Sequence, residues 1–212
     1  MNIMRVKTLG FAALLTLGAG LWIGGAAAKQ TADFKANSCR TFTEKAEREQ
    51  GIPRHLLTAI SLAETGRWSE EKQEIFAWPW TVMAKGRGLY FKSKIEAIVA
   101  VNRLRRAGVT NIDVGCMQIN LHHHPDAFED METAFDPAAN AAYAASFLNG
   151  LFKAHSSWGE AIRRYHSSNA KYNRPYHEKV ALAWNAARQD SAEAHRQAVI
   201  AAHLAQRARW RE

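Results

Sequence analysis

Hydrophobic residues recur along the chain at spacings of three and four, and helix-capping residues bound the stretches that carry them. This is the pattern of amphipathic helices. Capping boxes, in which Ser or Thr is followed three positions later by Glu, begin three of these stretches, and Asp136-Pro137 begins a fourth. The predicted helices cover residues 42–50, 53–65, 93–107, 136 to at least 151, 157–166, and 175 onward.

One segment between these helices has the character of strands. Aromatic and β-branched residues at 78–82 and 89–91 flank the Gly-rich sequence 85–88, which predicts a β-hairpin. The polar segment 167–173 is predicted to be a loop, and residues 189–212 are predicted to form a projecting helix or a frayed tail. The pattern therefore indicates an all-α domain with a small β-hairpin insertion.

Glu64 continues an apolar stripe where another hydrophobic residue would be expected. Leu57, Ile60 and Glu64 follow one another at helical spacing on one face, and Gly66 ends the helix. A half-buried carboxyl group loses hydration, which raises its pKa. An acid that is still protonated near neutral pH can protonate a leaving oxygen. The alternative is a surface Glu in the last turn, and the pattern alone leaves both interpretations open.

The length and composition allow one globular domain with a substantial core. The chain has 212 residues, of which 47% are hydrophobic and 23% charged, and its formal net charge is +8. A positive charge of this size suits a polyanionic partner such as nucleic acid, anionic lipid or an anionic cell-wall polymer. Basic residues are scattered except at Arg103–Arg106 and the C-terminal end, and no basic block alternates with aromatic residues. We therefore expect no nucleic-acid partner.

The first residues have the pattern of a secretory signal. Arg5 and Lys7 precede an apolar run, Leu9–Ile23, that is too short and too rich in glycine for a comfortable membrane span. The small residues that follow it fit a cleavage site near Ala28. We predict a signal peptide over 1–28 and an exported, periplasmic protein, with an uncleaved membrane anchor as the alternative.

Two cysteines, Cys39 and Cys116, follow this predicted signal. An even number of cysteines in an exported chain predicts a disulfide, because the compartment is oxidising. Two buried free thiols are one alternative, and a nucleophilic Cys116 with a histidine base is another.

Four short motifs follow one another along the chain: Ala63-Glu64-Thr65-Gly66, Gly115-Cys116-Met117-Gln118-Ile119-Asn120, Asp136-Pro137-Ala138-Ala139-Asn140-Ala141-Ala142-Tyr143 and Tyr165-His166-Ser167-Ser168. Their order resembles that of the lytic transglycosylases of the soluble-lytic-transglycosylase type. That family has Glu-Ser, Gly-x-Met-Gln-Ile, Ala-x-Asn-x-x-x-Gly/Tyr and Ala-Tyr-Asn-Ala-Gly, and Arg174-Pro175-Tyr176 resembles its later Arg-Gly-Tyr. The chain departs from the family at Thr65, which replaces Ser, and at His166-Ser167-Ser168, which replaces Asn-Ala-Gly.

The resemblance implies a lysozyme-like helical domain, which we place at residues 29–188, before a helical tail at 189–212. It also implies cleavage of the β-1,4 bond between N-acetylmuramic acid and N-acetylglucosamine in peptidoglycan. Glu64 would protonate the glycosidic oxygen and then take a proton from the substrate's own C6 hydroxyl, closing a 1,6-anhydro ring. A second carboxylate is then not required, unlike in most glycosidases. A hydrolytic lysozyme and a non-catalytic peptidoglycan-binding envelope protein are the alternatives.

The same resemblance supplies candidates for substrate binding. Gln118 is expected to bond a sugar N-acetyl or hydroxyl group, or to brace its own segment, and Tyr165 is expected to orient Glu64 or touch substrate. The remaining candidates are Met117, as cleft floor or core, Tyr143, as packing or cleft residue, and Tyr176. We expect peptidoglycan glycan strands as the partner, an envelope-assembly protein as a possible second one, and a monomer.

Several other residues are not expected to carry the chemistry. Asp113 is predicted to brace the turn before Gly115, with catalysis as the alternative. Consecutive histidines do not converge easily on a metal, so His122-His123-His124 is predicted to be a groove edge or solvated loop. We therefore expect no metal and no cofactor. The aromatic residues of the hairpin segment are predicted either to pack the hairpin or to stack on sugars: Trp78, Trp80, Tyr90 and Phe91.

Overall fold

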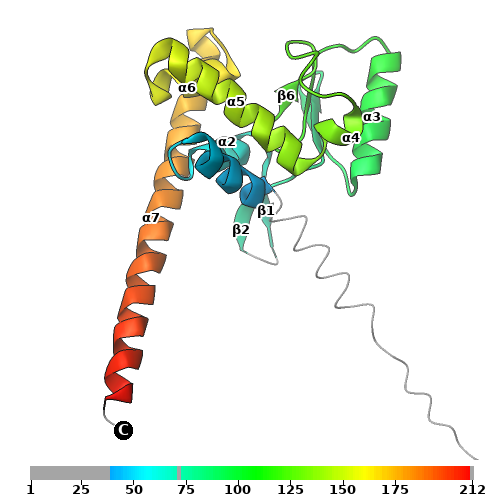
Figure 1. The fold of residues 1–212 in the computed structure, drawn as a ribbon. Coiled ribbons are helices and arrows are strands. Elements are labelled where there is room, and N and C mark those ends of the chain that lie inside the picture. The colour runs from blue at the N-terminus through cyan, green and yellow to red at the C-terminus, as the bar shows by residue number, and fades with distance from the viewer. Residues whose placement is uncertain (1–38, 71–72, 211–212) are drawn as a thin grey trace, which may run out of the picture.

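The computed structural model describes residues 39–70 and 73–210, and it is mostly helical (Figure 1). The predicted signal peptide and its cleavage near Ala28 lie outside the described residues. Within those residues, no helix combines the length and apolar character that crossing a membrane requires.

Each helix that the sequence pattern predicts is present, and one short helix, Met131–Ala134, was not predicted. A first helix covers 39–50, and the others are α2 (Leu56–Thr65), α3 (Lys94–Arg106), α4 (Met131–Ala134), α5 (Pro137–His155), α6 (Trp158–His166) and α7 (Ala170–Arg209). Three of the predicted caps are present, because Ser93, Asp136 and Ser157 each accept a hydrogen bond from a backbone N–H in the first turn of α3, α5 and α6. The capping box predicted at Thr41 was wrong, because the chain is already helical at Cys39 and Thr41 lies inside the first helix.

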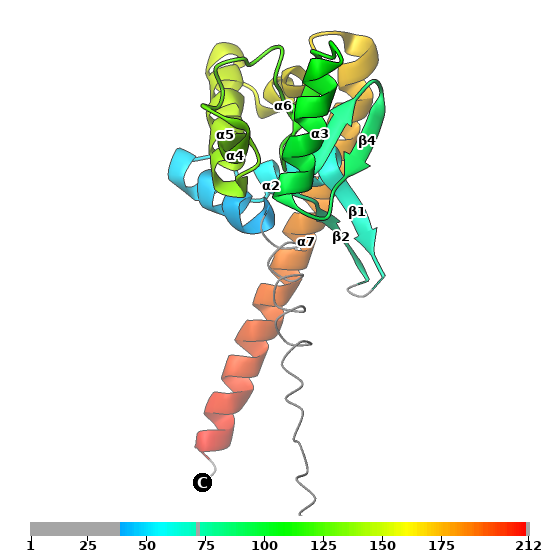
Figure 2. The same cartoon turned by 90° about the vertical axis from the view of Figure 1, so that its right-hand side faces the viewer.

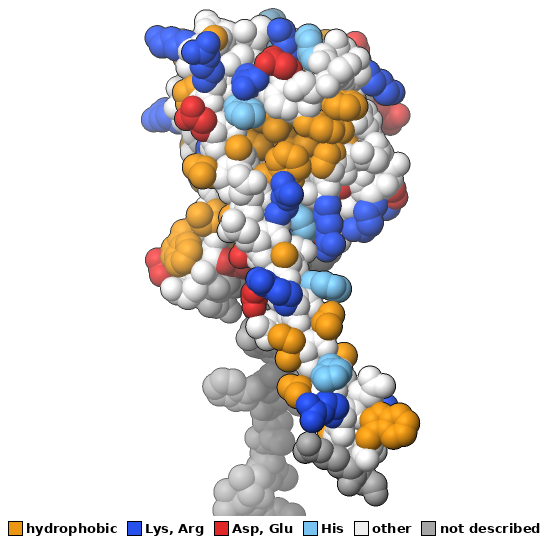
Figure 3. All heavy atoms as spheres, turned by 90° about the vertical axis from the view of Figure 1, so that its left-hand side faces the viewer, with side chains coloured by type: hydrophobic (Ala, Val, Ile, Leu, Met, Phe, Trp, Pro, Cys, Tyr) orange, Lys and Arg blue, Asp and Glu red, His pale blue; other side chains and the backbone are white. Residues whose placement is uncertain are grey.

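The prediction for the start of the last helix was wrong. Asn169 caps α7 by accepting a hydrogen bond from the backbone N–H of Lys171, so the helix begins at Ala170 and absorbs part of the predicted loop. Pro175 lies inside α7, where it removes one backbone hydrogen bond. The distal half of α7 projects from the domain, and every residue from 192 to 210 is exposed (Figures 1 and 3).

Two small antiparallel sheets interrupt the helices. β1 (Gly66–Ser69) pairs with β2 (Glu74–Ala77), and a four-stranded sheet has the order β4-β3-β5-β6. The predicted hairpin is confirmed as β3 (Thr81–Ala84) and β4 (Arg87–Tyr90). The pattern did not predict β1, β2, or the short strands β5 (Ile112–Val114) and β6 (Ile119–Asn120).

The four-stranded sheet has one face on the core and one face free for a site. Because side chains alternate along a strand, Val82 and Val114 point to one face while their neighbours Met83 and Asp113 point to the other. The core face packs on α3 through one buried cluster: Val82, Ala84, Ala97, Val101, Ile112, Val114, Leu121, Ala134 and Phe135. Met83 and Asp113 therefore lie on the face turned away from α3.

Candidate functional site

A cleft of about 350 Å³ lies on this second face of the sheet, between the strands and the helical part of the domain. Its lining comes from β3, β5, β6, the loop after β6, and the helices α2, α5 and α6: Glu64, Met83, Asn111, Asp113, Gln118, Ile119, Asn120, His123, His124, Phe147, Tyr165 and His166. The site therefore joins residues that are separated by about a hundred positions in the sequence.

Glu64 lies in the last turn of α2, where the helix meets the cleft. Leu57 and Ile60 on the same helix are fully buried, as the apolar stripe predicts. Burial raises the pKa of the Glu64 carboxyl group to about 7; a hydrogen bond from Tyr176 opposes the rise, and the charge of Asp113 adds to it. Glu64 therefore exchanges a proton near neutral pH, which is the property that the sequence suggested.

Both ends of α2 are fixed by specific contacts. At its start, the buried Glu47 carboxylate accepts hydrogen bonds from the backbone N–H groups of His55 (2.8 Å) and Thr58 (2.9 Å). These groups have no partner within the helix, so Glu47 takes the place of a helix cap. At its end, Gly66 is required because a Cβ there would lie 2.3 Å from the carbonyl oxygen of Leu62.

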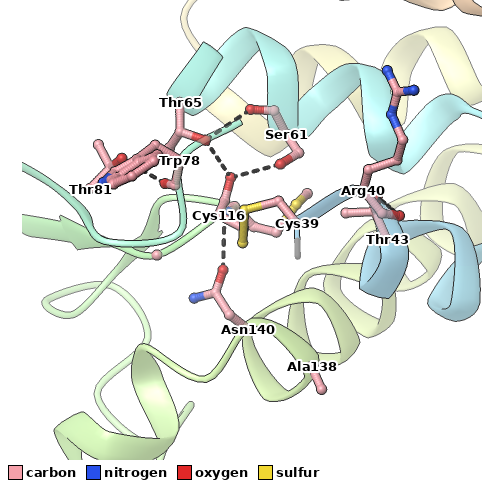
Figure 4. Close-up of a disulfide and its surroundings, with 12 residues drawn as sticks. Cys39, Arg40, Thr43, Ser61, Thr65, Trp78, Thr81, Cys116, Ala138 and Asn140 are labelled. Carbon is pink, nitrogen blue, oxygen red and sulfur yellow. Dashed lines mark hydrogen bonds between the residues drawn. A yellow bond between two sulfur atoms is a disulfide. The ribbon is translucent and has the colours of Figure 1, made fainter. Parts of the chain in front are cut away.

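The segment after β5 is anchored from two sides (Figure 4). The hydroxyls of Ser61 and Thr65 on α2 both donate to the carbonyl oxygen of Cys116, at 3.1 and 3.2 Å. On α5, the buried Asn140 accepts from the Met117 N–H at 2.8 Å. Gly115 has φ = 81°, and a Cβ there would lie 2.4 Å from Nδ2 of Asn140, so only glycine fits.

Cys39 and Cys116 form a disulfide with a Cα–Cα distance of 5.6 Å, as the sequence predicted (Figure 4). The disulfide ties the first described helix to the segment that forms one wall of the cleft. Both cysteines are fully buried, and neither lines the cleft. A nucleophilic Cys116 is therefore excluded.

Gln118 lies in the cleft wall with a left-handed backbone, φ = 48°. Its side-chain amide donates to the carbonyl oxygens of Gly115 (2.9 Å) and Thr81 (3.2 Å). Its Oε1 atom is buried and has no hydrogen-bond partner among the described residues. The NH₂ group therefore braces the cleft wall, as one of the two expected roles of Gln118 requires.

Met117 and the tyrosines each take one of the positions considered for them, except that the contact with Glu64 is made by another tyrosine. Tyr176, rather than Tyr165, donates a hydrogen bond to Glu64 (2.7 Å). Tyr165 lines the cleft and donates to the carbonyl oxygen of Met117 (2.8 Å). Met117 is fully buried, so its side chain belongs to the core and cannot contact substrate. Tyr143 stands behind the cleft, and its hydroxyl is 2.9 Å from Nδ1 of the lining residue His124.

Asp113 is the second carboxyl group of the cleft. It accepts a hydrogen bond from Asn120, directly opposite it on β6, at 2.7 Å. It therefore braces the β5–β6 pair, close to the predicted role, but it also faces the same cavity as Glu64. Burial raises the pKa of Asp113, and the hydrogen bond from Asn120 opposes the rise.

The sequence analysis did not predict some residues of the site, and it considered a cleft position for others that lie elsewhere. His166 lines the cleft, and its ring stacks on that of Tyr176 with centroids 4.4 Å apart. Its exchange for the asparagine of the family motif was the only hint. Glu47 had none, because its partners lie on another element. Asn120 ends the second motif, but the motif did not indicate its contact with Asp113. None of the hairpin aromatics lines the cleft. Trp78 packs edge-to-face on Trp80 and donates to the carbonyl oxygen of Phe91 at 2.7 Å, whereas Tyr90 is exposed.

The cleft and the carboxyl group at its base can be compared with known families. Residues 41–198 match the family model described as Transglycosylase SLT domain. No curated protein and no solved structure matches the chain. The family match covers most of the chain and includes every residue of the cleft. The chain therefore belongs to the transglycosylase SLT domain family, the lytic transglycosylases of the lysozyme-like superfamily that act on peptidoglycan.

Proposed function

We propose that the protein cleaves the β-1,4 bond between N-acetylmuramic acid and N-acetylglucosamine and leaves a 1,6-anhydro-muramic acid end. Glu64 would be the single residue that both gives and takes the proton. The observation that carries the proposal is the position of Glu64, half-buried at the end of α2 with its carboxyl group on the cleft and a pKa near 7.

Both protonation states of Glu64 are used in this reaction. The protonated carboxyl group gives its proton to the leaving oxygen of N-acetylglucosamine as the C1–O bond breaks. The carboxylate then removes the proton of the C6 hydroxyl while O6 bonds to C1, which restores the acid without consuming water. A pKa near the working pH suits a group with both tasks. Tyr176 holds the carboxyl group in place and stabilises the charged form.

Substrate binding would involve the polar walls of the cleft. Gln118, Tyr165 and His166 line the wall beside Glu64, where a sugar N-acetyl or hydroxyl group would lie. Tyr176 and Tyr143 would act behind this surface, through Glu64 and His124. Neither step of the proposed reaction requires a metal or a cofactor.

Hydrolysis is the second candidate, and Asp113 is the observation that favours it. Glycosidases that use water commonly place two carboxyl groups on either side of the scissile bond. Asp113 and Glu64 line the same cleft, and they influence one another electrostatically. A water molecule activated beside Asp113 would give a product with one more water than the anhydro product.

Mass spectrometry of the fragments released from purified peptidoglycan separates the candidates. Anhydro ends support the proposal, ends that contain the added water support the hydrolase, and a wall that is bound but not cut supports the non-catalytic binder. The variant Glu64→Gln should fold normally and lose cleavage by about 10²–10⁴-fold or more, because it cannot transfer the proton. Glu49→Gln, a change on the exposed surface, is the matched control. Near-normal turnover by Glu64→Gln would overturn the assignment.

A further inference from the structure

The segment that contains β4 and α3 has a large local excess of positive charge. Residues 85–110 contain seven Lys and Arg but a single acid, Glu96. The carboxylate of Glu96 is already bonded to the backbone N–H of Lys92 (3.0 Å). Five of the cations form no ion pair among residues 39–70 and 73–210: Lys85, Arg87, Arg103, Arg105 and Arg106.

Large apolar side chains lie among these cations. Ile95 and Val99 on the outer side of α3 are 70% and 58% exposed, and Leu89 on β4 is 40% exposed. With Phe91 they line a shallow groove that also contains Arg103. Single exposed apolar residues are ordinary, but a group of them on a segment rich in cations suggests a binding surface. We call this combination the α3 face, formed by Leu89, Ile95, Val99, Arg103 and Arg106.

The α3 face points away from the catalytic cleft. The core face of the four-stranded sheet packs on the inner side of α3, and the opposite face of the same sheet carries Met83 and Asp113 into the cleft. The sheet therefore separates the two surfaces. Figure 2 shows α3 and β4 on the outer surface of the molecule.

We propose that the α3 face is a docking site for a membrane surface that contains anionic lipid. The cations complement the headgroup charge, and Ile95, Val99 and Leu89 can enter the boundary between headgroups and acyl chains. A hydrophilic wall polymer would satisfy the cations but would leave these apolar side chains in water. Docking here needs no spanning helix, and it is a property of the folded domain.

The location of the α3 face determines where a membrane-bound domain would hold its catalytic cleft. This consequence rests on the proposed function. A domain that lies on a membrane through α3 holds its cleft on the opposite side of the sheet from the lipid. The cleft would then remain accessible to the peptidoglycan. Membrane docking would thus hold the enzyme beside its substrate without covering the site.

A local probe tests the contact directly. The variants Ile95→Cys and Leu182→Cys, in the full chain, are labelled with an environment-sensitive fluorophore. Leu182 on α7 is the matched control because it is apolar and 73% exposed, similar to Ile95. Vesicles of phosphatidylcholine and phosphatidylglycerol in about equal amounts should shift the emission of the label at 95 to the blue and leave the label at 182 unchanged. No shift at 95, or equal shifts at both positions, overturns the proposal.

Charge reversal tests the electrostatic part. The double variant Arg103→Glu/Arg106→Glu should bind these vesicles with an affinity at least about tenfold lower, since each cation near an anionic surface contributes to the affinity. Arg48→Glu on the exposed side of the first helix should bind as the unmodified chain does. The N-terminal run Leu9–Ile23 is present in every variant, so binding through it affects all of them equally.

The same variants are then assayed on purified, lipid-free peptidoglycan. Arg103→Glu/Arg106→Glu should release fragments at the normal rate, because the two residues lie outside the cleft. If the unmodified chain releases no fragments, the proposed function fails while the lipid contact can still stand. If it cleaves but the charge reversal leaves vesicle binding unchanged, the docking proposal fails alone.

Discussion

The hydroxyl of Tyr176 on α7 donates a 2.7 Å hydrogen bond to Oε1 of Glu64 on α2, across 112 positions of sequence. Burial of the Glu64 carboxyl group favours its protonated form, whereas this hydrogen bond favours the carboxylate. The balance gives a pKa of about 7 instead of a higher one. Tyr176 is itself buried and stacked on His166, so its hydroxyl has little freedom to leave the carboxyl group.

Tyr176→Phe should move the pH dependence of cleavage upward. Activity requires the protonated acid, so it falls as the pH rises through the pKa of Glu64, near 7. Removing the hydroxyl destabilises the carboxylate, so the pKa rises and the alkaline limb of the pH profile moves to higher pH. The measurement is the rate of fragment release from peptidoglycan as a function of pH.

The control for this change is Tyr143→Phe, which removes a hydroxyl bonded to His124 and not to Glu64. It should leave the alkaline limb in place. An unchanged limb in Tyr176→Phe, or the same displacement in both variants, would show that Tyr176 does not set the acidity of Glu64.

Asp113→Asn should move the same limb in the opposite direction. The negative charge of Asp113 raises the pKa of Glu64, so removing it lowers that pKa and the alkaline limb moves to lower pH. The side-chain oxygen of asparagine can still accept the hydrogen bond from Asn120, which preserves the β5–β6 contact.

This variant also reports on the second role considered for Asp113. If its carboxylate only tunes Glu64, the rate at the new optimum should stay within about tenfold of the unmodified rate. A loss of about 10²-fold or more at every pH, with water-added ends in the unmodified product, would make Asp113 a catalytic base.

The hydrophobic pattern predicted α3, α5 and α6 because each of them has an apolar face on the core and a capping residue at its start. Ser93, Asp136 and Ser157 make these caps with atoms two or three residues away, so local sequence contains the information. The same holds for the position of Glu64, which follows from the spacing of Leu57 and Ile60.

The features that the pattern missed depend on distant partners. The strands β5 and β6 have three and two residues, too few to show an alternation of their own. Glu47 has no sequence signature because its partners are backbone groups of another helix. Pro175 was taken for a helix start since proline favours that position, but the cap at Asn169 starts α7 earlier.

Glu47→Gln should destabilise the fold without touching the cleft. Both carboxylate oxygens of Glu47 accept backbone N–H groups at the start of α2, and glutamine offers a single oxygen, so its NH₂ group would face a donor. We expect a loss of about 1–3 kcal/mol in the free energy of unfolding, measured by urea denaturation. Glu49→Gln, an exposed change on the same helix, should cost at most about 0.5 kcal/mol.

The pH dependence of stability gives a second readout of Glu47. Burial raises its pKa in the folded state, so the folded protein binds more protons than the unfolded chain. The contribution of this group to stability is therefore present below the unfolded pKa of 4.5 and declines as the pH rises through the folded pKa. Glu47→Gln should remove this decline, and a variant that retains it in full would contradict the assignment.

Removing the disulfide should lower stability more than it lowers the activity of the folded protein. The disulfide closes a loop with a sequence separation of 77, for which chain entropy predicts a stabilisation of about 4 kcal/mol. In the double variant Cys39→Ala/Cys116→Ala, the hydrogen bonds from Ser61 and Thr65 to the carbonyl oxygen at 116 can still form, since they use the backbone. The cleft wall should therefore keep its shape below the unfolding transition. Urea denaturation measures the first effect, and fragment release at low temperature measures the second.

A reducing agent distinguishes the disulfide from the loss of two side chains. It should lower the free energy of unfolding of the unmodified chain toward that of the double variant, and it should leave the variant unchanged. If the double variant is as stable as the oxidised chain, the cross-link does not stabilise the fold. If it is less stable and also inactive while folded, the disulfide is needed to shape the segment from Gly115 to Gln118, and the hydrogen bonds from α2 and Asn140 are not sufficient for that task.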